Sequence, residues 1–157
     1  KIGHVETLQP PFSMLRRDVA AAELPWCAEH DTGVIVYSPM ESGLLTGAFS
    51  AERAAALEPG DWRSRAAEFT GQRLARTLAL VEELRPIAQR LDTTVASVAV
   101  AWTLAWPGVT AAIVGARRPD QIDGWLDAAT LRLDCDTLGE IAAALRATGV
   151  GSGPLQP

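Results

Sequence analysis

The sequence predicts an α/β protein built around a short parallel β-sheet. Three apolar runs are each followed by segments with helical periodicity, and this alternation is typical of parallel strands joined by helical crossovers. The middle run, residues 34–37, is β-branched and lies between Gly33 and Pro39, as expected for a strand buried on both faces. The third run ends in "VGARRPDQI", a pattern typical of a strand leading into the start of a helix.

The first half of the chain is predicted to hold two strands and one helix. Residues 5–8 form the first strand, which ends before Pro10 and Pro11. A helix of about ten residues should end near Asp31, with Pro25 in its first turn, where no backbone N–H is needed. After the strand at 34–37 comes a glycine-bearing loop, "MESGLLTGAFS". Residues 51–71 have weak periodicity and are expected to form a long excursion with helical pieces.

The second half is predicted to be mainly helical. Apolar residues at steps of three and four predict a helix over 72–91, namely Leu74, Leu78, Val81, Leu84, Ile87 and Leu91. The segment "DTT" at 92–94 should cap a further helix over 95–106, closed by Pro107-Gly108. The remaining expectations are a strand at 111–114, helices over 119–128 and 135–147, and a flexible Gly/Pro-rich tail at 148–157.

Composition narrows the class of protein. The chain has 157 residues, 48% of them hydrophobic, so one domain with a packed core is expected. A net charge of −5 argues against a general nucleic-acid-binding protein. No apolar run approaches the roughly 18 residues of a membrane span, so no membrane partner is expected. Two cysteines are too few for a disulfide framework, and a reducing cytoplasm is the expected location. Because the chain starts with Lys1 and enters an apolar segment almost at once, we expect it to belong to a longer protein.

The junction "VGARRPDQI" is a candidate anion site. Gly115 lets a ligand approach the backbone, and the helix start that is expected there offers N–H groups. Arg117 and Arg118 add two forked cations, which suit phosphate. The alternative is a solvated arginine pair beside a loop.

Three further positions could bind a ligand at the carboxyl ends of the strands. Tyr37 ends a buried strand, where its ring could stack on a heterocycle or simply fill the core. Gln9 ends the first strand, and its amide could pair with another amide or close a turn. Arg63, in "GDWRSR", could contact a ligand or belong to a solvated face.

Four segments together resemble the aldo-keto reductase family, in its bacterial and channel-β-subunit-like branches. They are "HVETLQPPFSMLRRD", "GVIVYSPMESGLLTG", "GDWRSR" and "VTAAIVGARRPDQIDGWLDAA", and the resemblance runs from His4 to about Leu145. It implies a (β/α)8 TIM barrel of which this chain is the C-terminal portion, strands six to eight with their helices. The chain would then lack the N-terminal half of the barrel.

The resemblance also assigns roles around the nicotinamide end of a cofactor. Gln9 matches the glutamine that holds the carboxamide, and Tyr37 matches the aromatic residue that stacks on the nicotinamide ring. The loop around the pyrophosphate is matched by Ser38, Pro39, Met40, Ser42 and Gly43.

At the other end, Arg63 is similar to the arginine of the segment that closes over the cofactor. The site for the 2′-phosphate and adenine is matched by Gly115, Arg117, Arg118 and Gln121. The paired arginines make NADP(H) the implied cofactor. Ala48 replaces a common lysine, and Gly124 and Trp125 replace a common Glu-Asn pair, which puts the affinity for the cofactor in question.

The family's catalytic aspartate, tyrosine, lysine and histidine have no counterpart in this sequence. Tyr37 is its single tyrosine, and Lys1 its single lysine. The resemblance therefore implies a parent enzyme that reduces a small carbonyl substrate with NADPH, of which this piece alone is inactive. Alternatives are a catalytically inactive NADP(H)-binding or sensing module, a half-barrel assembly subunit, and an unrelated α/β fragment with a phosphate site.

Overall fold

The protein is described by a computed structural model that covers residues 3–157. Its three strands, β1 (Thr7–Leu8), β2 (Gly33–Tyr37) and β3 (Val109–Ile113), form one parallel sheet in the order β1-β2-β3. Leu8 is paired with Val34, and Tyr37 with Ile113. The predicted α/β class and the parallel sheet are therefore confirmed. β1 is shorter than the predicted strand, although Gly33 still donates a 2.9 Å hydrogen bond to the carbonyl of Glu6.

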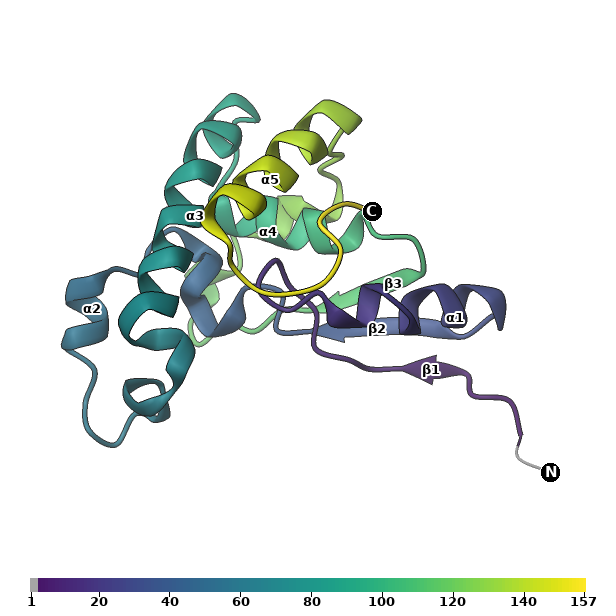
Figure 1. Ribbon diagram of the computed structural model, residues 1–157, viewed down its shortest axis with the longest axis horizontal. Helices are drawn as coiled ribbons and strands as arrows, with labels where there is room; N and C mark the ends of the chain where they lie inside the picture. The colour runs from purple at the N-terminus through teal and green to yellow at the C-terminus, as the bar shows by residue number, and fades with distance from the viewer. Residues whose placement is uncertain (1–2) are drawn as a thin grey trace.

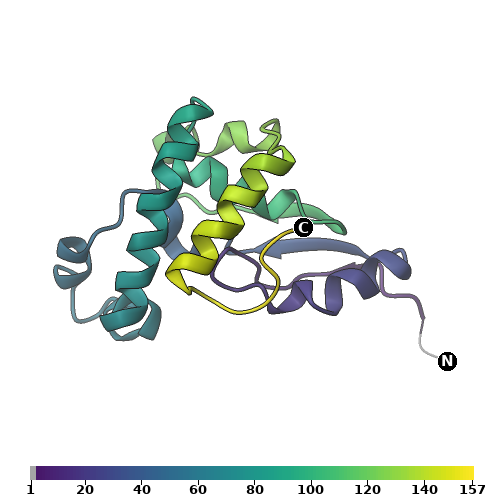
Figure 2. The same cartoon turned by 45° about the horizontal axis from the view of Figure 1, so that its top comes forward.

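Helices cover the sheet and extend beyond it (Figure 1). They are α1 (Glu23–Glu29), α2 (Ala51–Ala55), α3 (Gly71–Arg90), α4 (Val95–Leu104) and α5 (Cys135–Thr148). α4 contacts both β3 and α3, and α3 runs beside α5 (Figures 1 and 2). The arrowheads of the strands point toward the excursion that carries α2, so the carboxyl ends of the sheet face this excursion.

α4 is buried on nearly all sides, which explains why its sequence contains no charged residue. Each of its residues from Val95 to Thr103 is buried. Thr94 caps its first turn as predicted, because its hydroxyl oxygen accepts a 2.9 Å hydrogen bond from the N–H of Ser97. Trp102 lies at the centre of the core, 5.7 Å from the ring of Phe12. Within residues 3–157, no helix has both the length and the apolar character needed to cross a bilayer.

The helix predicted over 119–128 is wrong. Two short 3-10 helices, Pro119–Gln121 and Leu126–Ala129, replace it. Between them the carbonyl of Gly124 accepts a 2.6 Å hydrogen bond from the hydroxyl of Thr94, and a glycine inside a helix lowers its stability. The segment is therefore held against the N-terminus of α4 by hydrogen bonds and does not form a regular helix.

The C-terminal tail runs over the segment that follows β1 (Figures 1 and 2). The N–H of Arg17 donates to the carbonyl of Ser152 at 3.2 Å, and the buried Arg17 guanidinium donates to the carbonyl of Val150 at 3.1 Å. The hydroxyl of Ser152 bonds the carboxylate of Asp18 at 2.7 Å. The flexibility expected of the tail stays a prediction, and these contacts oppose it along residues 150–152.

Candidate functional site

The turn after β2 has an unusual backbone. Ser38, Glu41 and Ser42 have positive φ angles of 59°, 45° and 53°, and Gly43 follows at 102°. Such conformations cost energy for residues with a Cβ atom, and they gather at ligand sites and switch regions. Tyr37, just before the turn, is 38% exposed. The alternative prediction, that its ring fills the core, is therefore wrong.

Gln9 lies at the same edge of the sheet as Tyr37. The residue that follows it, Pro10, accepts a 3.0 Å hydrogen bond from the N–H of Tyr37, and the N–H of Phe12 donates to the carbonyl of Tyr37 at 3.1 Å. The side chain of Gln9 is exposed and does not line the cleft described below.

The junction at residues 115–118, Gly-Ala-Arg-Arg, differs from the expected helix start. The side-chain oxygen of Gln121 accepts from the backbone N–H groups of Arg117 at 2.7 Å and of Arg118 at 3.2 Å. Because Gln121 already binds these N–H groups and the 3-10 helix has only three residues, the helix start offers an anion little. Attraction of an anion here depends on the guanidinium groups.

The two arginines of the junction are not equivalent. The guanidinium of Arg118 makes two hydrogen bonds, of 3.0 and 2.9 Å, to the carboxylate of Asp120. These bonds lower the pKa of Asp120 and raise that of Arg118. In the described part of the chain, Arg117 makes no ion pair, and it is exposed. Arg117 is therefore the better placed of the two to receive a phosphate.

Arg63 is held by a carboxylate two residues away. Its Nη2 lies 2.6 Å from Oδ2 of Asp61, and its Nε donates to Oδ1 at 3.0 Å. These hydrogen bonds lower the pKa of Asp61 to about 2, and the positive charge of Arg117 contributes to the lowering. Arg63 is only 9% exposed, so it does not belong to a solvated face, which was the alternative prediction for this residue.

These segments meet in one cleft of about 1060 Å³, at the carboxyl end of the sheet. The cleft is lined by all the residues that the sequence predicts to bind a cofactor, except Gln9. Those that line it are Tyr37, Ser38, Pro39, Met40, Ser42, Gly43, Arg63, Gly115, Arg117, Arg118 and Gln121.

Several lining residues were not predicted. Asp61 and Trp62 come from the excursion, and Thr94 comes from the N-cap of α4. The sequence offered a signal for Asp61, since a carboxylate two residues before an arginine can cap a turn and pair with it. Thr94 was predicted as a cap, but nothing in the sequence places that cap beside the loop after β3.

The cleft suits an extended, partly anionic cofactor. Its volume reaches the upper end of the range for small-molecule and cofactor sites. Apart from the adjoining residues, no described atom lies within 4 Å of the Cβ position of Gly43 or Gly115, so both glycines leave open space where a ligand could approach. Tyr37 and Trp125 offer aromatic surface, and Arg117 offers a positive charge that no carboxylate within residues 3–157 pairs with.

Known proteins resemble this chain over most of its length. The model of the aldo/keto reductase family matches residues 3–146. The chain is 29% identical over 146 residues to the NADH-specific methylglyoxal reductase of Escherichia coli, covering 91% of this chain and 44% of that protein. It is 36% identical over 121 residues to a probable voltage-gated potassium channel subunit beta of Arabidopsis thaliana, covering 73% of this chain and 35% of that protein.

Among solved structures, a glycerol dehydrogenase from Gluconobacter oxydans superposes with a TM-score of 0.86 and 26% identity. The match covers 98% of this chain and 46% of that one. The chain thus spans less than half the length of the relatives and the structure it matches here. Since the family model covers nearly all of the sequence, the chain belongs to the aldo/keto reductase family.

Proposed function

We propose that this chain is the cofactor-binding C-terminal portion of an NADPH-dependent aldo-keto reductase. In this view it supplies strands six to eight of a (β/α)8 barrel, and the missing N-terminal half supplies the proton donor and its partners. The complete protein reduces an aldehyde or ketone by transfer of a hydride. We place it in the cytoplasm and assign it neither a nucleic-acid nor a membrane partner.

One observation carries the proposal. Eleven of the twelve residues assigned to the cofactor, from three separate segments of the chain, line a single cleft at the carboxyl end of a parallel sheet. Ligands of parallel α/β folds bind at this edge. Side chains that served only as core or as scattered surface would not converge in this way.

Each lining segment has a distinct role in the proposed site. A bound nicotinamide cofactor supplies the hydride, while Tyr37 stacks on its ring. Gln9, at the same edge of the sheet but outside the cleft lining, is assigned to its carboxamide. The turn at 38–43 surrounds the pyrophosphate, and its left-handed residues bring the backbone close to it. Arg63, fixed by Asp61, lies in the segment that closes over the pyrophosphate.

Arg117 is the residue that favours NADPH over NADH in this proposal. Its guanidinium is unpaired in the described part of the chain, whereas that of Arg118 is already bound to Asp120. One free arginine instead of two makes the preference for NADPH modest. The similarity to an NADH-specific reductase of E. coli is compatible with such a narrow margin.

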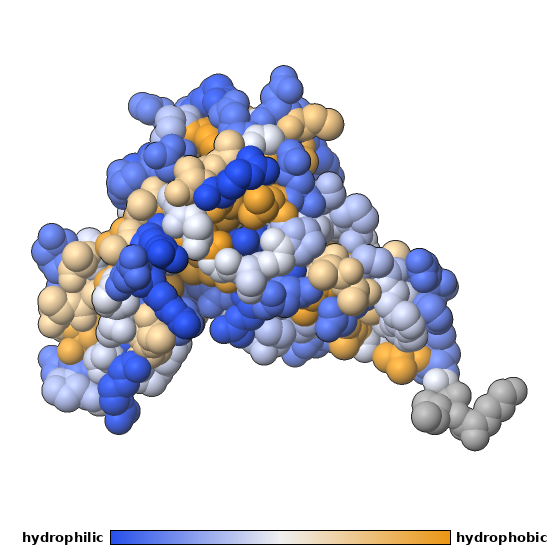
Figure 3. Space-filling view, viewed as in Figure 1, coloured by the Kyte–Doolittle hydropathy of each residue, from blue (hydrophilic) through white to orange (hydrophobic). Residues whose placement is uncertain are grey.

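The missing half of the barrel has a surface to pack against. An apolar groove of about 520 Å³ runs beside β1, whose outer edge is unpaired in the described sheet. Its lining includes Val5 and Trp26, each 48% exposed. In Figure 3 apolar surface appears at the end of the molecule where β1 and the N-terminus lie. Exposed apolar surface beside an open strand edge is typical of a protein interface.

The proposal is tested by titrating the 157-residue chain with NADPH while recording the fluorescence of the reduced nicotinamide. Saturable binding that weakens in Arg117→Ala is the expected result. A chain with native circular dichroism that binds neither NADPH nor NADH would contradict it. The control variant is Arg146→Ala, on α5 and outside the cleft.

A second candidate is an NADP(H)-binding or sensing module without turnover, alone or as a half-barrel subunit that assembles with a partner. The similarity to a plant channel subunit favours it. Oxidation of NADPH by this chain in the presence of a range of aldehydes and ketones would rule out the second candidate. It would also overturn the expectation that the chain alone is inactive.

A further inference from the structure

Trp125 occupies the part of the cleft where an amide or carboxylate would be expected to read the base of the cofactor. It lines the cleft together with Thr94, Gln121 and Gly124. Gly124 has no side chain with which to form a hydrogen bond. The indole N–H of Trp125 is buried and has no hydrogen-bond partner in the described structure, so it is not exposed to a base in the cleft.

The backbone on both sides of Trp125 is fixed to the N-terminus of α4. The carbonyl of Gly124 accepts a 2.6 Å hydrogen bond from the hydroxyl of Thr94. Asp127 accepts hydrogen bonds from the hydroxyls of Thr93 and Ser97. The ring also packs against the cluster formed by Val100, Ala101 and Ala128. An aromatic ring held in this way can stack on a flat heterocycle with little loss of side-chain entropy.

Each side chain near Trp125 that could accept a hydrogen bond from a base already accepts one from another protein group. The oxygen of Gln121 accepts two backbone N–H groups, and both carboxylate oxygens of Asp120 bind Arg118. The hydroxyl oxygen of Thr94 accepts from Ser97. Gln121 retains only its amide N–H₂ group, a donor, which can meet N7 of a purine. Adenine and hypoxanthine share N7 and differ at positions 1 and 6: adenine has an acceptor at N1 and a donor at position 6, whereas hypoxanthine has a donor at N1 and an acceptor at position 6.

Resting on the proposed function, we infer that Trp125 binds the purine of the cofactor by stacking, and that this site does not distinguish adenine from hypoxanthine. Stacking on an aromatic side chain tolerates any base, because every base has a π-face. Discrimination among dinucleotides then comes from the 2′-phosphate at Arg117 and from the nicotinamide end, while the base contributes affinity without selectivity.

The test compares NADPH with its reduced hypoxanthine analogue, both titrated into the 157-residue chain and followed by nicotinamide fluorescence. Dissociation constants within about threefold of each other are expected. Binding of NADPH at least tenfold tighter than the analogue would overturn base tolerance while leaving the proposed function intact. A wild-type chain that binds neither dinucleotide would overturn both.

Two substitutions test the stacking itself. Trp125→Phe keeps an aromatic ring and should retain most of the affinity for both dinucleotides. Trp125→Leu keeps apolar bulk without a π-face and should weaken both by about 5- to 150-fold, the range for loss of one base–aromatic stack. Equal affinities in these two variants, with thermal melting confirming that both are folded, would refute stacking by Trp125.

Discussion

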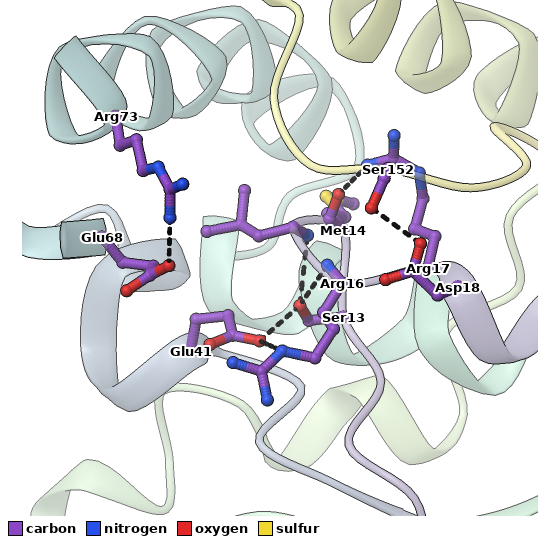
Figure 4. A network of polar contacts seen from close by, with 10 residues as sticks. Ser13, Met14, Arg16, Arg17, Asp18, Glu41, Glu68, Arg73 and Ser152 are labelled. Carbon is purple, nitrogen blue, oxygen red and sulfur yellow. Dashed lines mark hydrogen bonds and ion pairs between the residues drawn. The ribbon is translucent and has the colours of Figure 1, made fainter. Parts of the chain in front are cut away.

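The hydroxyl of Ser13 donates a 2.8 Å hydrogen bond to Oε1 of Glu41, and this bond links the turns that follow β1 and β2 (Figure 4). Ser13 is fully buried, and its oxygen also accepts from the N–H groups of Leu15 and Arg16 at 3.1 and 3.2 Å. Only 12% of the Glu41 side chain is exposed, and Arg16 approaches it to 4.0 Å. The strained turn at 38–43 is therefore tied to the segment after β1 through its own largely buried carboxylate, that of Glu41.

Glu41→Gln should change how stability depends on pH. Burial raises the pKa of Glu41, against the opposing effects of Ser13 and Arg16. The native state therefore holds this proton more tightly than the unfolded chain does. The contribution of Glu41 to stability is full below pH 4.5, the ordinary pKa, and is lost as the pH rises through the raised pKa. Urea unfolding should show that the wild type loses stability relative to Glu41→Gln over this rise in pH.

Glu82→Gln is the matched control, because Glu82 is exposed and makes a surface ion pair with Arg85. Its stability should follow that of the wild type at every pH. If Glu41→Gln and Glu82→Gln gave the same pH profile, the buried carboxylate would have no part in the pH dependence.

Ser13→Ala should destabilise the protein at neutral pH by about 1–3 kcal/mol, because a buried carboxylate then loses a donor.

Arg63→Lys should weaken the binding of NADPH by about tenfold, because a lysine keeps the charge but cannot form the forked pair with Asp61 and a ligand oxygen at once. Arg65 lies in the same 3-10 helix, is exposed, and does not line the cleft. Arg65→Lys should therefore bind NADPH as the wild type does. Fluorescence titration of both variants decides the matter, and an equal loss in both would mean that only the net charge of the segment counts.

Asp120→Asn should increase the preference for NADPH over NADH. The carboxylate of Asp120 now occupies the guanidinium of Arg118, and its removal would leave a second forked cation for the 2′-phosphate. The ratio of the two dissociation constants should rise by about three- to tenfold at low salt and fall again as salt screens the charges. A ratio that does not move would place the 2′-phosphate away from Arg118. Asp123→Asn, an exposed change outside the cleft, serves as the control.

The elements that periodicity predicts are those that bury an apolar face. The strand at β2 and the helices at α3, α4 and α5 were predicted because their apolar spacing directly reflects burial. The segment at 119–128 failed because Gly124 and Asp127 are held by Thr94 and Ser97, contacts that no local pattern encodes. The cleft shows the same limit of local patterns. The sequence predicts its arginines, but only the structure shows that a carboxylate pairs with Arg118 and not with Arg117 in the described residues.

The packing of the tail can be tested at its glycines. Gly151 and Gly153 lie against other backbone atoms, whereas Gly149 faces open space. Gly149, Gly151 and Gly153 all have positive φ angles. A Cβ atom at Gly151 would lie 2.3 Å from the carbonyl oxygen of Leu15, and one at Gly153 would lie 2.6 Å from that of Arg17, whereas none meets an atom within 4 Å at Gly149. Alanine at Gly149 should therefore cost only the left-handed backbone, about 1–2 kcal/mol.

Gly151→Ala adds a backbone clash to the same conformational cost, so its loss in urea unfolding should exceed that of Gly149→Ala by at least about 1 kcal/mol. The tail would have to leave Arg17, whose guanidinium would then lose the carbonyl of Val150 while still buried. Faster amide exchange at Arg17, whose N–H bonds the carbonyl of Ser152, should accompany this loss in Gly151→Ala and not in Gly149→Ala. Equal losses in the two variants would show that residues 150–153 do not hold Arg17 in solution, as expected of a flexible tail.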